Sequence, residues 1–275
     1  MTAERLVQLL ILAAAGGLLS LLLAAFALPR ASGRLVRVNI NGRPVPALLG
    51  VAVVGAGLLA GSVGVMGFTE VGWDVLLLGL LAPIGLLFAA GFWDDLRGVE
   101  HARGFAGHLE AARARRLTGG VVKAIAGFLA GLCAGVVLKS GWGVVQFALL
   151  VPLAANFVNL TDRAPGRAGK VGLAAGIPLL ALGDPDWSIV AAPFLGALAA
   201  VLPLDLGEKG MLGDAGANPL GGLIGLGLAM SMSIYWGWAA LGVLLALNLA
   251  SERWSYSGIV DRVGPLNWLD ELGRK

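Results

Sequence analysis

Three groups of polar residues stand at or beside the ends of long apolar runs, and their side chains suit the binding of a metal and a phosphate. They are Asp94-Asp95 in Phe-Trp-Asp-Asp, Asn156, Asn159 and Asp162 in NFVNLTD, and Asp214 in MLGDAG. Carboxylates in such places are costly unless they pair or bind a cation, so they mark a functional site. If separate helices bring the three groups to one face of a membrane, they form one polar site.

Each group also has a purely structural interpretation. Asp94 and Asp95 can simply end an apolar helix, although adjacent carboxylates repel and need a nearby cation to stay ionised. Asn156 and Asn159 share a helix face, where amides also serve as interhelical hydrogen-bonding groups. Asp214 is a favoured type of helix N-cap.

Two helix starts add possible phosphate contacts. The free N–H groups at a helix N-terminus attract anions, so the start of the run after Asp214 is expected to hold a diphosphate. The sequence Leu117-Thr118-Gly119-Gly120 opens another run, and glycines there let the backbone approach a phosphate.

The composition is that of a membrane protein. The chain has 275 residues, of which 57% are hydrophobic and 13% charged, whereas a soluble domain carries about 25% charged residues. We expect an all-α polytopic fold in one integral domain, residues 1–275, with an interfacial cytoplasmic tail over 251–275 that Pro265 interrupts. About nine transmembrane helices are expected, over residues 6–28, 47–68, 73–92, 119–138, 142–159, 169–183, 188–204, 216–232 and 235–250.

Basic residues predict the orientation. All Lys and Arg residues except Arg5 and Lys139 fall in the long connections, in the tail, or within a turn of them. The positive-inside rule then places these segments in the cytoplasm, the N-terminus outside and the C-terminus inside. Because orientation explains the basic charge, we expect no nucleic-acid partner, and membrane lipid is the expected surroundings. All three polar groups then face the cytoplasm.

In their order along the chain, these motifs resemble those of the polyprenyl-phosphate N-acetylhexosamine-1-phosphate transferases, a superfamily that includes the phospho-MurNAc-pentapeptide transferase. The resemblance covers roughly residues 40–250. It is carried by Gly42-Arg43-Pro44-Val45-Pro46, Gly91-Phe92-Trp93-Asp94-Asp95, Leu117-Thr118-Gly119-Gly120 with Lys123, Asn156-Phe157-Val158-Asn159-Leu160-Thr161-Asp162 and Leu212-Gly213-Asp214-Ala215-Gly216.

The resemblance implies that a polyprenyl phosphate, such as undecaprenyl phosphate, attacks the β-phosphorus of a UDP-N-acetylhexosamine and releases UMP. It implies a bacterial plasma membrane and a possible homodimer. By position it makes Asp214 and Asn159 ligands of Mg²⁺, while Asp94 orients or deprotonates the lipid phosphate. It further assigns supporting catalytic roles to Asp95, Asp162 and Lys123, and substrate contacts to Asn156, Arg43, Arg103 and Gly119.

The chain also departs from the family pattern. Pro165 stands where relatives often have an acidic or amide residue, and a histidine-rich loop and a tenth span are missing, which disfavours a MurNAc-pentapeptide substrate. These features describe a shortened, divergent branch. Two other functions remain open: a non-catalytic relative that binds polyprenyl phosphate in envelope assembly, and a membrane transporter with a polar midplane site.

Overall fold

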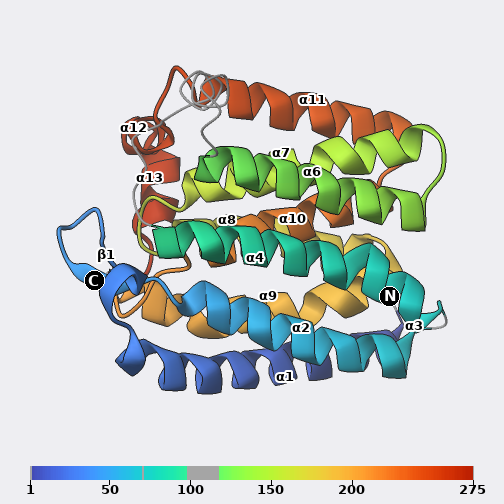
Figure 1. Ribbon diagram of the computed structural model, residues 1–275, viewed down its shortest axis with the longest axis horizontal. Helices are drawn as coiled ribbons and strands as arrows, with labels where there is room; N and C mark the ends of the chain where they lie inside the picture. Colours follow the sequence, from blue (N-terminus) through green and yellow to red (C-terminus); the bar gives the residue numbers. More distant parts are fainter. Residues whose placement is uncertain (1, 70, 98–117, 275) are drawn as a thin grey trace.

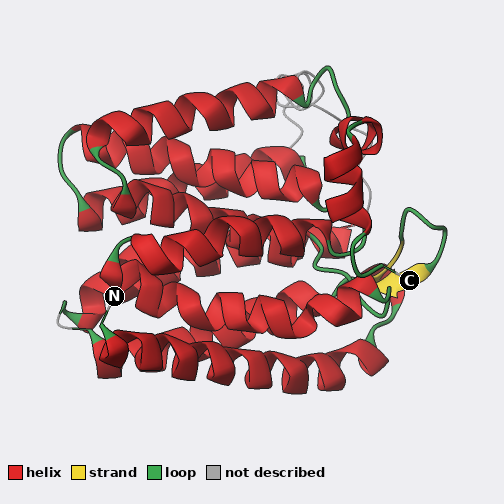
Figure 2. Cartoon of the chain, turned by 180° about the vertical axis from the view of Figure 1, so that it is seen from behind, coloured by secondary structure: helices red, strands yellow, loops and turns green. Residues whose placement is uncertain are grey.

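The computed structural model describes residues 2–69, 71–97 and 118–274, and long helices account for most of them. The helices lie side by side in layers, with their ends at two opposite sides of the molecule (Figure 1). The view from behind shows the same stack, with the short strands at one of those sides (Figure 2).

The described elements are mainly helices, with two short strands. The helices are α1 (Ala3–Ala27), α2 (Leu49–Phe68), α3 (Trp73–Leu76), α4 (Ala82–Arg97), α6 (Gly119–Leu138), α7 (Trp142–Thr161), α8 (Arg167–Leu182), α9 (Pro185–Leu206), α10 (Asp214–Ser231), α11 (Ile234–Ala250), α12 (Tyr256–Arg262) and α13 (Gly264–Glu271). A π-helical segment, Leu77–Leu81, joins α3 to α4, and two 3₁₀ turns, Leu28–Arg30 and Gly33–Leu35, follow α1. Strands β1 (Val36–Val38) and β2 (Pro44–Pro46) pair antiparallel.

The expected all-α membrane fold is confirmed in its main features. Each expected span coincides with a helix to within a few residues. Among the described residues, six helices are long and apolar enough to cross a membrane: Ala3–Arg30, Leu49–Phe68, Trp73–Arg97, Gly119–Leu138, Trp142–Thr161 and Pro185–Leu206. Helices α8, α10 and α11 are not among these six, so a total of nine spans stays a prediction.

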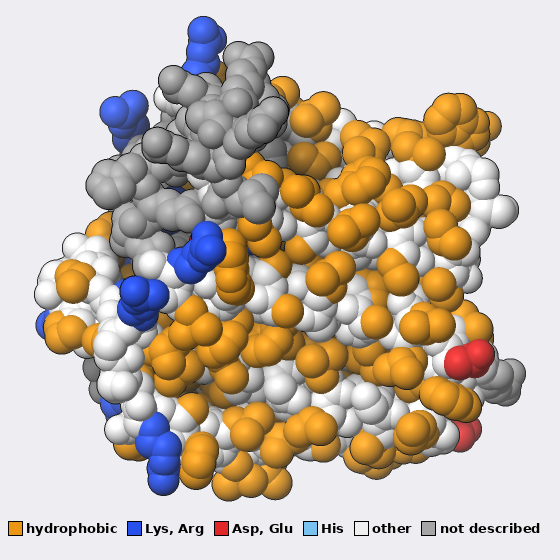
Figure 3. Space-filling view, in the orientation of Figure 1, with side chains coloured by type: hydrophobic (Ala, Val, Ile, Leu, Met, Phe, Trp, Pro, Cys, Tyr) orange, Lys and Arg blue, Asp and Glu red, His pale blue; other side chains and the backbone are white. Residues whose placement is uncertain are grey.

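The two ends of the stack differ in charge. On the face shown in Figure 3, hydrophobic side chains cover the middle, and Lys and Arg lie at the end that carries the strands. Acidic side chains are visible at the opposite end. The two chain termini also lie toward opposite ends (Figure 1). This is the pattern of an apolar belt with one basic rim, and the side that faces the cytoplasm stays a prediction.

Helix α10 occupies the centre of the bundle. It packs against α7, α4, α2 and α8, and most of its residues are buried. Glycines allow this close packing in a membrane, where small residues let backbones approach. At Gly91, for example, a β-carbon would collide with the backbone carbonyl of Asp214. The end of α4 is therefore pressed against the start of α10.

Two further elements stand at the basic end: a hairpin, which was not predicted from the sequence, and the predicted tail. The hairpin β1–β2 turns through the three-residue loop Ile40-Asn41-Gly42, which Asn39 N–H closes by donating to the carbonyl of Arg43. Gly42 has a φ of +76°, as the last residue of such a loop commonly does. The tail contains two short helices with a break at Val263, and Pro265 lies directly after this break, in the first turn of α13. Both elements border the site described next.

Candidate active site at one end of the bundle

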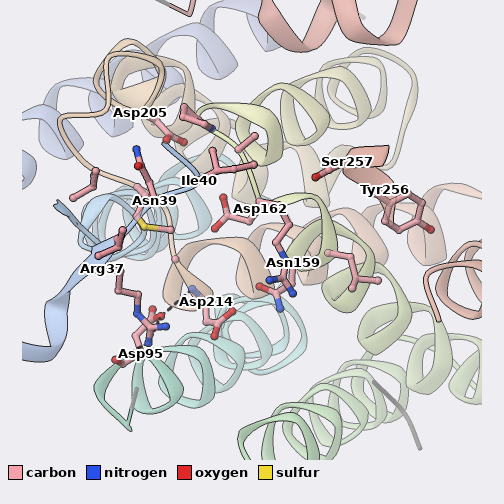
Figure 4. A pocket seen from close by; sticks show the side chains of 18 of the residues that line it. Arg37, Asn39, Ile40, Asp95, Asn159, Asp162, Asp205, Asp214, Tyr256 and Ser257 are labelled. Carbon is pink, nitrogen blue, oxygen red and sulfur yellow. Dashed lines mark hydrogen bonds and ion pairs between the residues drawn. The ribbon is translucent and has the colours of Figure 1, made fainter. Parts of the chain in front are cut away.

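A cavity of about 710 Å³ opens at the basic end of the bundle. Its wall is formed by the hairpin, by the ends of α4, α7 and α9 with the residues that follow α7 and α9, by the starts of α6, α10 and α12, and by residues before α12. Figure 4 shows several of the polar side chains that converge there. The charged members of the wall are Arg37, Asp95, Lys123, Asp162, Arg163, Asp205, Glu208 and Asp214. Acidic groups outnumber basic ones among them, so a bound cation would help to keep these carboxylates ionised together.

Lys123 links two of the predicted groups. Its Nζ lies 2.7 Å from Oδ2 of Asp94 and 3.1 Å from Oδ2 of Asp214. All three side chains are mostly buried, with 15–20% of each exposed. An ammonium group has three N–H donors, and these two carboxylates use two of them. Lys123 also lines the cavity, so it is placed to donate to a third oxygen there.

Asp95 points toward a different neighbour from Asp94. Adjacent helical residues diverge by about 100°, and the side chain of Asp95 is only 1% exposed. Its oxygens accept hydrogen bonds from the backbone N–H groups of Ala215 (2.8 Å) and Asp214 (3.3 Å). Arg37 lies 3.5 Å from it and supplies the expected cation. Asp95 thus caps helix α10 and fixes the position of Asp214.

Two glycines are required where these carboxylates lie. Gly213 precedes α10 with a φ of +66°, a conformation that side-chain-bearing residues rarely adopt. A β-carbon on it would also lie 2.9 Å from a carboxylate oxygen of Asp95. A β-carbon on Gly119 would occupy the position of the Asp94 carboxylate. Gly119 therefore makes room for Asp94.

Asp162 and Asn159 line the cavity on the side of α7. Asp162 follows the last residue of that helix. Burial raises its pKa well above the ordinary value, and the carboxylates of Asp205, Asp214 and Asp95 raise it further. A backbone hydrogen bond from Gly213 opposes this effect. A carboxyl group in such surroundings is stabilised when a cation binds beside it.

The structure leaves other predicted site residues away from the cavity wall. The Asn156 amide donates to Oδ1 of Asn248 on α11 at 2.6 Å, which is the interhelical bond that the structural interpretation expects. Arg43 is 70% exposed and pairs with Glu208 at 2.9 Å. Gly119 is not part of the wall. Arg103 lies outside the described residues.

The expected diphosphate site on the N-terminal N–H groups of α10 is wrong. The N–H groups of Asp214 and Ala215 are bonded to Asp95. Those of Gly216 and Ala217 are bonded to the carbonyl of Gly213. With its first turn satisfied inside the protein, this helix has no N–H group left for a phosphate.

Several residues in the wall were missed by sequence reasoning. Asp205 is 4% exposed, and its Oδ2 atom has no hydrogen-bond partner among the described residues. It stands at the end of the apolar run 188–204, so the criterion that selected Asp94 and Asp162 would also have found it. Arg37 and Asn39 enter from the hairpin, which the sequence analysis did not predict.

The donor set fits a hard divalent cation that is held partly by its substrate. Among the described residues, no three His, Cys, Asp or Glu side chains converge as a preformed metal site. Mg²⁺ usually takes one or two carboxylates and completes its shell with water and substrate phosphates. Asp214, Asp162 and Asn159, whose side chains carry oxygen donors, line one cavity.

One of the comparisons with known proteins identifies a family. No curated protein matches the chain. A family model described as Glycosyl transferase family 4 matches residues 77–235. The matched segment is more than half of the chain and contains Asp94, Lys123, Asp162 and Asp214. This multi-pass membrane protein therefore belongs to glycosyl transferase family 4.

Proposed function

We propose that this protein transfers a sugar-1-phosphate from a UDP-sugar to a polyprenyl phosphate at the cytoplasmic face of a bacterial plasma membrane. One phosphate oxygen of the lipid bonds to the β-phosphorus of the donor. The bond from that phosphorus to the oxygen bridging to the α-phosphate breaks, so that UMP leaves and a lipid diphosphate sugar remains. The observation that carries the proposal is the cavity that joins Lys123, Asp162 and Asp214 at one end of the bundle.

Positioning and charge neutralisation account for most of the catalysis in a phosphoryl transfer. A lipid phosphate is already largely dianionic near pH 7, because its second pKa is about 6. Asp94 is paired with Lys123 at 2.7 Å, so we assign it the task of holding that ammonium rather than removing a proton. Lys123 can then donate its remaining N–H to a phosphate oxygen.

Asp214, Asp162 and Asn159 are the residues that would hold Mg²⁺. When bound, the ion would neutralise charge on the diphosphate and on the leaving UMP. The carboxylate of Asp95 maintains the position of Asp214 by capping α10. The carboxylates of the wall favour binding of this cation. The bound cation would in turn offset the repulsion between these carboxylates and the diphosphate of the donor.

The position of the site supports a cytoplasmic reaction. The cavity is at the end of the stack where Lys and Arg gather (Figure 3). Basic ends of membrane proteins face the cytoplasm, where nucleotide sugars are made. A transporter would place its polar site near the middle of the bundle, whereas these polar residues lie at helix ends.

The test is a reaction of purified protein with undecaprenyl phosphate and a panel of UDP-sugars, with Mg²⁺ or EDTA, in which UMP is measured. We expect UMP to form with at least one UDP-N-acetylhexosamine and to stop with EDTA. The variant Asp214→Asn should remove this release while the protein still expresses and folds. The matched control is Asp74→Asn, which removes an exposed carboxylate near the start of α3.

Two outcomes would oppose the proposal. Full UMP release by Asp214→Asn would remove the assigned site. Binding of the lipid by the wild type without turnover of any UDP-sugar would instead indicate a non-catalytic relative.

A further inference from the structure

The C-terminal tail is attached to the bundle by a buried ion-pair network. Asp270 on α13 is 6% exposed, and so is Arg167 at the start of α8. Arg167 donates two parallel hydrogen bonds to Asp270, at 2.8 and 2.7 Å. Arg274 donates to the same carboxylate at 2.6 Å. A bidentate guanidinium–carboxylate pair fixes the direction as well as the distance between two elements.

The same network reaches the wall of the active-site cavity. The Nε atom of Arg274 donates to the carbonyl of Pro165 at 2.9 Å, and Arg167 donates to Ser257 at 2.8 Å. Pro165 and Ser257 both line the cavity. Figure 4 shows Ser257 and Asp162 within the same group of side chains. The three residues of the network thus lie behind two separate parts of that wall.

Residues 162–166 need such support because they lie outside regular secondary structure. Asp162 is at the start of this segment and Arg167 follows directly after it. Its backbone makes turn-type hydrogen bonds, such as that from Asp162 N–H to the carbonyl of Asn159. The backbone of Gly213 is also bonded to the Asp162 carboxylate, and that of Gly166 to Asp205, so the contact of the tail with Pro165 is one of three attachments. Gly166 has a φ of +71°, which gives it a conformation that is unusual for other residues. Without a partner, the Pro165 carbonyl would rely on water.

The charges of the network stabilise the contacts between Asp270 and the two arginines. Burial alone would raise the pKa of Asp270, but hydrogen bonds from Arg167 and Arg274 outweigh that effect and lower it. Lys170 adds hydrogen bonds to the carbonyls of Leu269 (2.9 Å) and Asp270 (2.6 Å). Removal of the carboxylate would leave Arg167 without its bidentate partner, while Asp205 would remain as an anion that interacts with Arg274 and Lys170.

We propose that Asp270 is a positioning residue, which acts through Arg167 and Arg274 to hold residues 162–166 and the tail segment 251–257 as one rigid wall of the cavity. Asp162 is thereby kept where it can contribute an oxygen to the cation of the proposed reaction. Asp270 itself does not line the cavity. Supporting groups of this kind commonly alter metal affinity about 10- to 100-fold when they are removed.

The first test is hydrogen–deuterium exchange of the full-length protein in nanodiscs, which needs no catalytic activity. In Asp270→Asn, we expect exchange of residues 162–170 and 251–257 to become faster by a factor on the order of ten or more. Exchange in α9 should not change. Asp270→Glu, which retains the charge, should restore most of the protection. The matched control Glu271→Gln removes a neighbouring exposed carboxylate, whose hydrogen-bond partner is Asn267, and should behave as wild type.

A second variant covers the case in which Asp270→Asn fails to fold. Arg274→Gln removes the bond to Pro165 and leaves the Arg167–Asp270 pair in place. We expect faster exchange in residues 162–166, with α8 and α9 unchanged. Faster exchange limited to residues 264–274 in both variants, with 162–166 protected as in wild type, would overturn the inference.

The second test is kinetic and depends on the proposed function. In Asp270→Asn, the Mg²⁺ concentration for half-maximal UMP release should rise about 10- to 100-fold. The KM for the lipid phosphate should stay unchanged, and high Mg²⁺ should restore much of the rate. An unchanged Mg²⁺ requirement would contradict the positioning role. If the wild type releases no UMP from any donor, the proposed function fails, while the exchange experiment still decides whether the tail fixes the cavity wall.

Discussion

The substitution Asp95→Asn separates a residue that positions the site from the residues that perform its chemistry. The Asp95 carboxylate is 1% exposed and accepts two backbone N–H groups at the start of α10. An amide keeps one acceptor oxygen, and its NH₂ group then faces a backbone donor. One N–H at the helix start loses its partner inside the protein.

The expected loss of stability can be worked out from these contacts. A buried donor left without a partner costs about 1–3 kcal/mol. Loss of a negative charge at a helix N-terminus adds about 1 kcal/mol. The ion pair with Arg37 is longer, at 3.5 Å. Arg37 also donates to the backbone carbonyl of Asp95 at 2.8 Å, which the substitution leaves in place, so loss of the ion pair adds little. The free energy of unfolding should therefore fall by about 2–4 kcal/mol, a large part of the total of about 5–15 kcal/mol that is typical of folded proteins.

The assay is thermal unfolding of the wild type, Asp95→Asn, Asp214→Asn and the exposed control Asp74→Asn in the same detergent. We expect a clearly lower melting temperature for Asp95→Asn alone. In UMP release, Asp95→Asn should retain a measurable rate because Asp214 is still present, whereas Asp214→Asn should not. If Asp95→Asn has the same melting temperature as the wild type, the carboxylate of Asp95 does not cap α10, and the assignment of Asp95 as a positioning residue is wrong.

Three further predictions follow from contacts in the site and the tail. Lys123→Met leaves two carboxylates facing each other without a cation, so UMP release and melting temperature should both fall, and added Mg²⁺ should stabilise this variant more than the wild type; equal stabilisation would count against a cation site there. Gly119→Ala places a β-carbon where the Asp94 carboxylate lies, so the rate should fall at least about tenfold through misplacement of the site, while Gly85→Ala, which has open space, should keep full activity. Because the pKa of Asp270 is lowered in the folded state, its contribution to stability is fully present above its unfolded pKa of about 3.9 and is lost as the pH falls through the folded value. The difference in melting temperature between the wild type and Asp270→Asn should stay constant from pH 8 to pH 5 and shrink below pH 4, and a difference that already shrinks between pH 7 and pH 5 would contradict this assignment.

The gathering of Asp94, Asp162 and Asp214 was predictable because apolar runs of spanning length fix where helices end. Successive runs cross the membrane in opposite directions, so the end of one run and the start of the next lie at the same face. The three acidic residues all lie at ends or starts that share one face. The cavity contains Asp162 and Asp214, and Asp94 lies next to it through Lys123.

The different roles of Asp94 and Asp95 were not predictable from their types. Which carboxylate meets Lys123 and which meets α10 depends on the rotation of α4, and that rotation is set by the contact between Gly91 and the carbonyl of Asp214. The network at Asp270 was hidden for another reason. Arg167 and Asp270 are separated by about a hundred residues in the sequence. A basic residue such as Arg167 at a membrane face is also already explained by the positive-inside rule, so nothing pointed to a specific partner.

The burial of α10 limits how the site can change over evolutionary time. Gly216 meets backbone atoms of α2, and Gly221 and Gly225 meet those of α7, so larger residues have no space at these positions. The hairpin and the tail, in contrast, border the cavity from outside the bundle. We expect that homologues which accept other donors have diverged in these two rims, by insertion, deletion or exchange of side chains. In the same homologues, we expect α10 to retain these glycines.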